Sequence, residues 1–327
     1  MQAAWYESQG AACAVLVVGS MPDPHAGPGE VRVRILASGI NPGDLKKRDD
    51  SFGLGMAYPR VIPHSDGAGF IDEVGDGVSA ARVGQRVWCF GAQSYRPFGT
   101  AAQYTVVPDQ QAVLLPANVS FEAGACLGIP ALTAHRAVLA GGPVAGRDVL
   151  VQGGAGGVGS FACGFARRAG ARVIATVRSD GEAQVARDAG AHDVVRTDAR
   201  PSADIVAIVR RLAPDGVHHV VEVAFDANIE LDEQVLALGG SIAAYATGNA
   251  RPLIPFWNLL FKNARLLLMG SDDFPTEQKL EAASAVNDLL KQGWQGLRIA
   301  RTFPLADIAS AHEHAESRPR GRVVLSI

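Results

Sequence analysis

The stretch DVLVQGGAGGVGSFACGFARRAG, residues Asp148–Gly170, decides how this chain folds. Its apolar start predicts a buried strand over Val149–Gln152. Its amphipathic second half predicts a helix over Gly157–Ala169, which Gly170 ends. Five glycines in seven residues separate these two elements. A strand, a glycine loop and a helix in this order are typical of a phosphate-binding turn.

The glycines allow a tight turn and let the backbone approach a pyrophosphate closely. The helix N-terminus then presents unpaired N–H groups and the positive end of the helix dipole. A glycine-rich turn without a ligand is the alternative interpretation. We expect the cofactor-binding residues of this loop to be Ala155, Gly156, Gly157 and Val158.

Apolar strands alternate with amphipathic helices in the rest of this region. The expected strands are Arg172–Val177, Val217–Val223, Ser241–Ala246 and Arg265–Met269, and the expected helices are Glu182–Asp188, Ala203–Leu212 and Glu230–Leu238. Such an alternation requires a parallel sheet with helices on both faces. The predicted fold class is therefore α/β, with a doubly wound parallel sheet.

The first third of the chain has a different pattern. EVRVRILASGI, which begins at Glu30, alternates apolar residues with arginines, and the short apolar stretches GFIDEVGDGV, GQRVWCF and AQYTVVP follow it. These stretches predict a small antiparallel β-domain. From Ser120, a candidate N-cap, the spacing becomes helical. The terminal strand GRVVLSI, after a helix over Glu277–Lys291, has no sheet of its own and is expected to return to the first domain.

We expect residues 1–122, completed by residues 265–327, to form the β-rich catalytic domain. Residues 123–264 are expected to form the parallel-sheet domain. A chain of 327 residues exceeds the usual size of a single domain, which agrees with this division.

The composition favours a small-molecule partner. The formal net charge of −3 gives no long-range field that would attract nucleic acid or an anionic membrane. The four cysteines form no C-x-x-C pair, as expected of reduced thiols. Neither a signal peptide nor a membrane-length apolar run is apparent. We expect a cytoplasmic protein with no nucleic-acid or membrane partner.

The end of the second parallel strand bears on which dinucleotide binds. NAD-preferring folds place an acidic residue there, to bind the ribose 2′-hydroxyl. This chain has Arg178 and Ser179 at that point, a pair suited to a 2′-phosphate. Asp180 and Glu182 follow closely and argue in the other direction, and Arg178 as a solvated strand-end residue is the alternative. The sequence therefore favours NADPH.

Motifs along almost the whole chain resemble the medium-chain dehydrogenase/reductase superfamily, and specifically its zinc-free quinone oxidoreductase branch, the zeta-crystallin-like proteins. The motifs are ASGINPGDLKKR, VIPHSDGAGFIDEVGDGV, GIPALTAHRAVL, VLVQGGAGGVG, VVEVAFDANIELD and SRPRGRVVLSI. The resemblance implies a GroES-like β-rich domain and a Rossmann domain with the active site between them. It also implies a homodimer joined through Rossmann-domain edges, where Arg265–Gly270 is a candidate edge strand.

The zinc-dependent members of this superfamily carry metal ligands at three positions that this chain has changed. Those positions correspond here to Asn41, Ser65 and Ile129, and none of these side chains is a thiolate or imidazole. The four-cysteine structural lobe of those members is also missing. The resemblance therefore implies no metal. His64 adjoins the changed positions and is either a loop histidine or, less favourably, a ligand.

The resemblance also implies roles for individual residues. Asn41 would lie near the nicotinamide ribose and donate to a developing oxyanion, and Thr133 would contact the nicotinamide side of the cofactor. Arg318 would lie close to the adenosine phosphate, with Arg322 nearby. Tyr245 and Thr247 follow a strand end, on the edge where such folds bind cofactors. A structural role is an equal alternative for Arg322 and Tyr245.

Two further sets of residues remain open. Lys46 stands where several relatives have a tyrosine, and is either a proton donor or oxyanion partner, or a surface lysine. His312 and His314 lie two apart on an expected helix and so point to different faces, while His218 and His219 alternate along a strand. Both histidine pairs are expected to be structural or solvated.

These observations lead to one expected function with two alternatives. The expected function is an NADPH-dependent, zinc-independent quinone oxidoreductase. The first alternative is an alkenal or enoyl reductase that acts on an α,β-unsaturated carbonyl. The second is an NADPH-binding protein of low activity with a structural or RNA-binding role.

Overall fold

The computed structural model describes residues 1–294 and 296–327, and the chain divides into two compact units. Unit 1 comprises Met1–Pro130 and Pro275–Ile327, and unit 2 comprises Ala131–Phe274. Both boundaries lie a few residues later than the ones expected from the sequence. At the second boundary, residues 265–268 form a strand that belongs to the sheet of unit 2.

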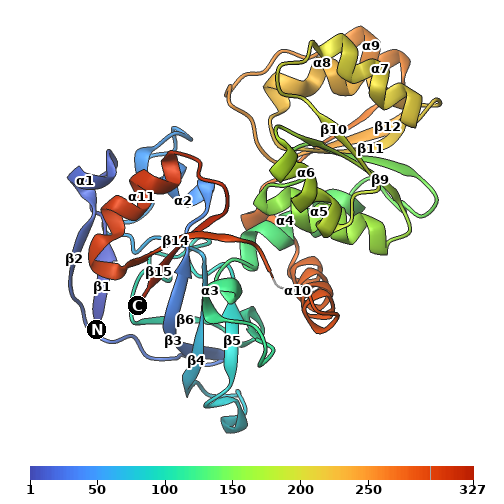
Figure 1. Ribbon diagram of the computed structural model, residues 1–327. Coiled ribbons are helices and arrows are strands. Elements are labelled where there is room, and N and C mark those ends of the chain that lie inside the picture. Colours follow the sequence, from blue (N-terminus) through green and yellow to red (C-terminus); the bar gives the residue numbers. More distant parts are fainter. Residues whose placement is uncertain (295) are drawn as a thin grey trace. The chain divides into compact units, whose positions relative to one another are not determined.

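Unit 2 contains a six-stranded parallel sheet with the strand order β10-β9-β8-β11-β12-β13. The strands are β8 (Asp148–Val151), β9 (Arg172–Val177), β10 (Asp193–Arg196), β11 (Val217–Glu222), β12 (Leu236–Ala244) and β13 (Arg265–Leu268). The helices are α4 (Gly128–Leu139, which begins in unit 1), α5 (Gly157–Arg168), α6 (Asp180–Ala189), α7 (Ser202–Leu212), α8 (Phe225–Val235) and α9 (Phe256–Phe261). Helices α5 and α6 cover one face of the sheet, and α7, α8 and α9 cover the other (Figure 1). The predicted doubly wound sheet is confirmed.

Two helices of this region differ from the expected ones. The helix expected over Glu230–Leu238 is α8, which begins at Phe225 and ends at Val235, because Leu236 already pairs with Val217 as the start of β12. The helical stretch after Ser120 is two helices, α3 (Phe121–Gly124) and α4. Pro130 lacks a backbone N–H, so it is tolerated only in the first turn of a helix. A new helix, α4, therefore begins just before Pro130 instead of continuing α3.

Unit 1 is built on a mixed sheet with the strand order β14-β15-β3-β4-β5-β7, and β6 also pairs with β3. The strands are β3 (Glu30–Gly39), β4 (Asp66–Val74), β5 (Arg86–Cys89), β6 (Tyr104–Pro108), β7 (Ala112–Leu114), β14 (Ile299–Pro304) and β15 (Arg322–Ser326), with β1 (Gln2–Trp5) and β2 (Val17–Ser20) as a separate pair. Strand β15 pairs with β3 in antiparallel fashion. The predicted return of the terminal strand is therefore confirmed.

Unit 1 also contains helices outside this sheet. Besides α3, they are α1 (Ala12–Val15), α2 (Pro42–Asp49), α10 (Thr276–Lys291) and α11 (Ile308–Glu316), with single turns at Ala80–Arg82, Asp109–Gln111 and Leu305–Asp307. A further single turn, Ser271–Asp273, lies at the end of unit 2. Helix α11 packs against α2 and β15 (Figure 1), so the end of the chain contacts elements of its first fifty residues. In the part of the chain that the structure describes, no helix combines the length and apolarity that crossing a membrane requires.

The start of α5 packs against the backbone of the glycine loop. A Cβ atom placed on Gly159 would lie 2.1 Å from the carbonyl oxygen of Gly153. No side chain fits in that space, so the contact requires glycine at position 159. Gly153 also has a φ of +69°, a conformation that glycine adopts without strain.

We predict that Gly159→Ala lowers the free energy of unfolding by about 1–3 kcal/mol, because the added methyl group forces α5 away from the loop. Gly43→Ala, in α2, is the matched control, since nothing lies within 4 Å of the added Cβ. That control should be neutral or gain up to about 1 kcal/mol of helix propensity. Denaturant unfolding of both variants measures the difference, and equal stability of Gly159→Ala and the wild type would contradict the packing argument.

Candidate active site

The glycine loop joins the end of β8 to the start of α5. Gly156 is the N-cap of α5, and its N–H donates to the carbonyl of Gly153 at 2.9 Å. Ala155, Gly157 and Val158 are partly exposed at this helix N-terminus. The predicted loop residues therefore lie together where the helix dipole and the first N–H groups favour an anion.

The residues after β9 form a compact polar turn. The backbone N–H of Arg178 donates to Glu182 Oε2 at 2.7 Å, and the Ser179 hydroxyl accepts from the N–H of Glu182 at 3.2 Å as the N-cap of α6. The Arg178 guanidinium is 3.6 Å from Glu182 and largely exposed. Glu182 thus holds the turn through its backbone contacts and also pairs with the Arg178 guanidinium, which stays exposed enough to meet a phosphate.

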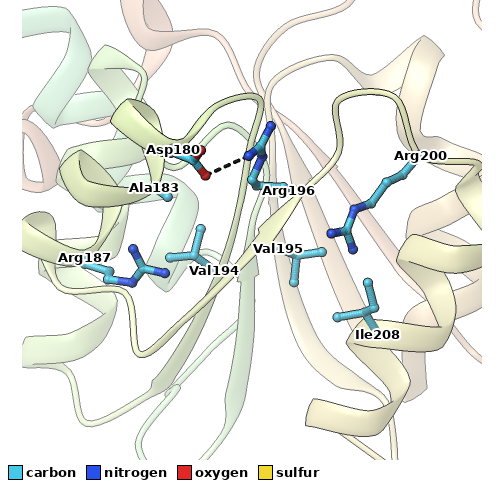
Figure 2. A pocket seen from close by; sticks show the side chains of 8 residues that line it. All are labelled: Asp180, Ala183, Arg187, Val194, Val195, Arg196, Arg200 and Ile208. Atoms are coloured by element: carbon cyan, nitrogen blue, oxygen red, sulfur yellow. Dashed lines mark hydrogen bonds and ion pairs between the residues drawn. The ribbon is translucent and has the colours of Figure 1, made fainter.

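The neighbouring strand β10 forms one wall of a hollow of about 240 Å³ (Figure 2). Arg196 Nη1 donates to Asp180 Oδ1 at 2.7 Å, and Arg196 also pairs with Asp198. The hydrogen bonds that Arg196 donates to Asp198 and Asp180 raise the pKa of its guanidinium, which stays charged. The full lining is Asp180, Ala183, Arg187, Val194, Val195, Arg196, Arg200 and Ile208. With three guanidinium groups and one carboxylate, this hollow suits an anionic group.

The other residues predicted for cofactor binding in unit 2 lie within α4 or after β12. Thr133 is buried in α4. Tyr245 follows β12, is half-buried, and burial raises the pKa of its phenol. The Thr247 hydroxyl donates to Asp226 Oδ1 at 3.1 Å, so Asp226 already holds one side of that loop.

In unit 1, Asn41 is the N-cap of α2 and both ends of its side-chain amide are bound. Its Nδ2 donates to Asp66 Oδ2 at 2.8 Å, and its Oδ1 accepts from Arg322 Nη2 at 2.5 Å. The side chain is buried, with 2% of its surface exposed. An amide nitrogen carries two hydrogens, and Asp66 accepts a hydrogen bond from one of them. The structure thus fixes which way the Asn41 amide points.

The Arg322 guanidinium binds Asn41 in unit 1, and its expected place near an adenosine phosphate stays a prediction. Arg318 lies just past α11 with a φ of +53°. The Lys46 ammonium lies 5.6 Å from the centre of the Phe52 ring. Lys46 is half-buried on α2, five residues after Asn41. Its role as a proton donor stays a prediction.

Asp66 is a site residue that sequence reasoning missed. It starts β4, is fully buried, and accepts from both Asn41 and the N–H of Ile129, the latter at 2.8 Å. Burial raises its pKa to about 7, and the hydrogen bond from Asn41 opposes this shift. A Cβ on Gly128 would lie 2.1 Å from Asp66 Oδ1, which explains the glycine there. The motif HSDGAG contained this residue, but only the fold shows that it binds Asn41.

The positions that match zinc ligands in relatives hold no ligand set of their own. Ser65 is buried, Ile129 contributes its backbone N–H to Asp66, and Asn41 binds Asp66 and Arg322. Over residues 1–294 and 296–327, no group of three or more His, Cys, Asp or Glu side chains is placed to hold a metal ion.

His64 and His312 form a buried stacked pair that the sequence did not predict. Their Nε2 atoms are 2.9 Å apart, their ring planes differ by 21°, and His64 Nδ1 is 2.8 Å from the Ser38 hydroxyl. Burial lowers the pKa of His64 to about 3 and that of His312 well below its ordinary value, so both rings are neutral. The pair joins α11 to the segment before β4, and the structural role expected for His312 stays a prediction.

Comparisons with known proteins agree with both units. Residues 27–117 match the family model described as alcohol dehydrogenase GroES-like domain, and residues 157–283 match the one described as zinc-binding dehydrogenase. Positions 41, 65 and 129 lie outside the second match.

Several relatives with whole-length similarity are quinone oxidoreductases. The chain is 31% identical to that of Rattus norvegicus, over 94% of this chain and 91% of the relative, and 30% identical to that of Mus musculus, over 91% and 87%. Among solved structures, a mycobacterial quinone oxidoreductase is 28% identical with a TM-score of 0.85, and a mycobacterial protein in complex with NADPH is 27% identical with a TM-score of 0.86; both cover 100% of each chain. The chain belongs to the quinone oxidoreductase branch of the medium-chain dehydrogenase/reductase superfamily.

Proposed function

We propose that this protein is an NADPH-dependent, zinc-independent quinone oxidoreductase. The observation that carries the proposal is the glycine loop of unit 2, at a helix N-terminus between β8 and α5, with the largely exposed Arg178 guanidinium, which pairs with Glu182, at the end of the next strand. The similarity to quinone oxidoreductases, and to a mycobacterial protein in complex with NADPH, supports it.

The residues of both units fit this cofactor and substrate. The loop N–H groups and the α5 dipole would hold the pyrophosphate, and Arg178 would bind the 2′-phosphate by charge-assisted hydrogen bonds. When bound, NADPH supplies a hydride. Asn41 would donate its second amide hydrogen to the substrate oxygen that gains negative charge. Asp66 and Arg322 hold that amide in one orientation, so no reorganisation is needed when the charge develops.

A quinone needs little further activation. Its conjugated carbonyls accept a hydride readily, whereas an alcohol must first lose a proton, for which the metal-dependent relatives use a Lewis acid. The side chains at positions 41, 65 and 129 are an amide, a hydroxyl and an aliphatic group. This donor set does not fit zinc, which prefers thiolate and imidazole ligands.

We predict that the purified protein oxidises NADPH with 1,4-benzoquinone and 9,10-phenanthrenequinone, at the same rate with and without EDTA. The reason is that Asn41, rather than a metal ion, stabilises the developing oxyanion. A panel of α,β-unsaturated aldehydes and enoyl thioesters, run in parallel, tests the alternative substrate class. Turnover of these compounds without turnover of either quinone would replace the proposed substrate, and loss of turnover with EDTA would refute zinc independence.

We predict that Arg178→Ala raises the dissociation constant for NADPH about tenfold or more and leaves that for NADH nearly unchanged, because only NADPH carries the 2′-phosphate. Fluorescence titration of both cofactors measures this. Arg211→Ala, an exposed arginine at the end of α7, is the matched control for the loss of one positive charge. An equal effect on both cofactors would show that Arg178 does not read the 2′-phosphate.

An exposed apolar surface on unit 2 supports a homodimer. Strand β13 ends the parallel sheet, so no strand lies beside its outer edge in the part of the chain that the structure describes. Large apolar side chains on β13 and on and before α9 are exposed: Leu253 (89%), Phe256 (55%), Trp257 (66%), Phe261 (73%) and Leu268 (76%). Pairing two β13 edges about a two-fold axis would cover both the edge and these side chains.

We predict a particle of twice 34.2 kDa by light scattering at micromolar concentration, which Trp257→Glu converts to a monomer by placing a charge in the interface. Leu54→Glu is the control, because Leu54 is equally apolar and 85% exposed but lies in unit 1. A monomeric wild type, or dissociation by both variants alike, would contradict this interface.

A further inference from the structure

A line of buried polar groups lies beneath the glycine loop of unit 2, and the proposed function does not use it. The N–H of Gly153 donates to Thr176 Oγ1 at 3.0 Å, and the Thr176 hydroxyl donates to Gln152 Oε1 at 2.6 Å. Gln152 Nε2 then donates to Asp232 Oδ1 at 2.7 Å. Three elements contribute: the end of β8 with the loop, β9 and α8. Each group acts as donor to the next, so the hydrogen bonds run in one direction.

The line ends at two carboxyl groups. Asp232 and Glu222 both have 0% of their surface exposed, and burial and the charge of Glu222 raise the pKa of Asp232. Among the described residues, Asp232 Oδ2 has no hydrogen-bond partner. Two ionised carboxylates repel strongly in a buried site, and a carboxylate oxygen without a donor is poorly stabilised. Burial and the missing donor therefore favour a proton on one of the two acids.

The other contacts show which acid is charged. Glu222 Oε1 accepts from the N–H of Ala224, and both Glu222 oxygens accept from Asn228 Nδ2, at 3.0 and 3.2 Å. Asp232 accepts only from Gln152. Hydrogen-bond donors stabilise the charged form, so the negative charge lies on Glu222 and the proton on Asp232. Burial raises the pKa of both acids, and the charge of Glu222 raises that of Asp232 further.

We propose that Asp232, as a protonated acid near ionised Glu222, is a positioning residue that anchors the glycine loop through Gln152 and Thr176. In this arrangement every donor from Gly153 onward points toward the one buried negative charge. Hydrogen bonds in such a line polarise one another and strengthen the whole. The line fixes Gly153, the first residue of the loop, and so orients the N–H groups that follow. The link to cofactor affinity rests on the proposed function; the shared proton and the anchoring of Gly153 do not.

The first test compares two replacements of Asp232. Asp232→Ala removes the acceptor of Gln152 and should raise the dissociation constant for NADPH about tenfold or more. Asp232→Asn keeps an acceptor oxygen for Gln152 and supplies an amide N–H to Glu222 in place of the carboxyl proton. It should restore the affinity to within about threefold of the wild type. If Asp232→Asn bound NADPH as weakly as Asp232→Ala, the assignment of the proton to Asp232 would be overturned.

The second test cuts the line at its other end. Thr176→Val keeps the shape of the side chain but removes the hydroxyl that links Gly153 to Gln152. Thr105→Val is the matched control, because Thr105 is also buried in a strand and its hydroxyl has no hydrogen-bond partner. Amide hydrogen exchange at Gly153 should become about tenfold faster or more in Thr176→Val and stay unchanged in Thr105→Val. Unchanged exchange in both would show that the line does not anchor the loop.

The third test observes the proton directly. The infrared difference spectrum between the wild type and Asp232→Asn at pH 8 should contain the C=O stretching band of a protonated carboxyl group. Absence of that band would overturn the shared proton. If the wild type fails to bind NADPH, the proposed function falls, while the infrared band and the exchange at Gly153 still decide whether the acid pair anchors the loop.

Discussion

Unit 2 depends on one close contact between two backbone segments. The first turn of α5, at Gly159, packs against the backbone of the turn that follows β8, at Gly153. A side chain at position 159 would overlap the carbonyl of Gly153, so the helix can approach only because glycine stands there. The same approach directs the N-terminus of α5 at the loop. The sheet order with β8 beside both β9 and β11 then places the ends of these strands around the loop. Helix position, loop shape and anion affinity thus follow from a single close contact.

Buried acids have a common purpose in the two units. In unit 1, Asp66 binds the Asn41 amide and the N–H of Ile129, and in unit 2, Glu222 and Asp232 lie at the end of the hydrogen-bonded line from the glycine loop. In each case a carboxyl group that is costly to bury holds a backbone or amide group in one orientation. These acids lie next to the candidate site residues, whose orientation they fix.

The sequence predicted the features that depend on local pattern. The strand and helix around residues 148–170, the doubly wound sheet and the return of β15 to β3 all follow from hydrophobic periodicity and glycine placement. The start of α8 and the break after α3 were missed, because strand pairing at Leu236 and the position of Pro130 override helical spacing.

The site was predicted only in part, and its partners explain why. Asn41 binds Asp66 and Arg322, which lie 25 and 281 residues away in the chain, and His64 binds His312, which lies 248 residues away. No periodic or compositional signal joins such distant positions. The glycine loop, by contrast, is contained within a few consecutive residues, so it was recognisable.

The place of β15 in the sheet of unit 1 has a consequence for synthesis on the ribosome. Strand β3 is made among the first forty residues, yet its neighbour β15 is the last element of the chain. All strands of unit 2 lie between them and pair only with one another. The nascent chain can therefore complete the second unit while the first still exposes an open strand edge, which closes only once β15 has been synthesised.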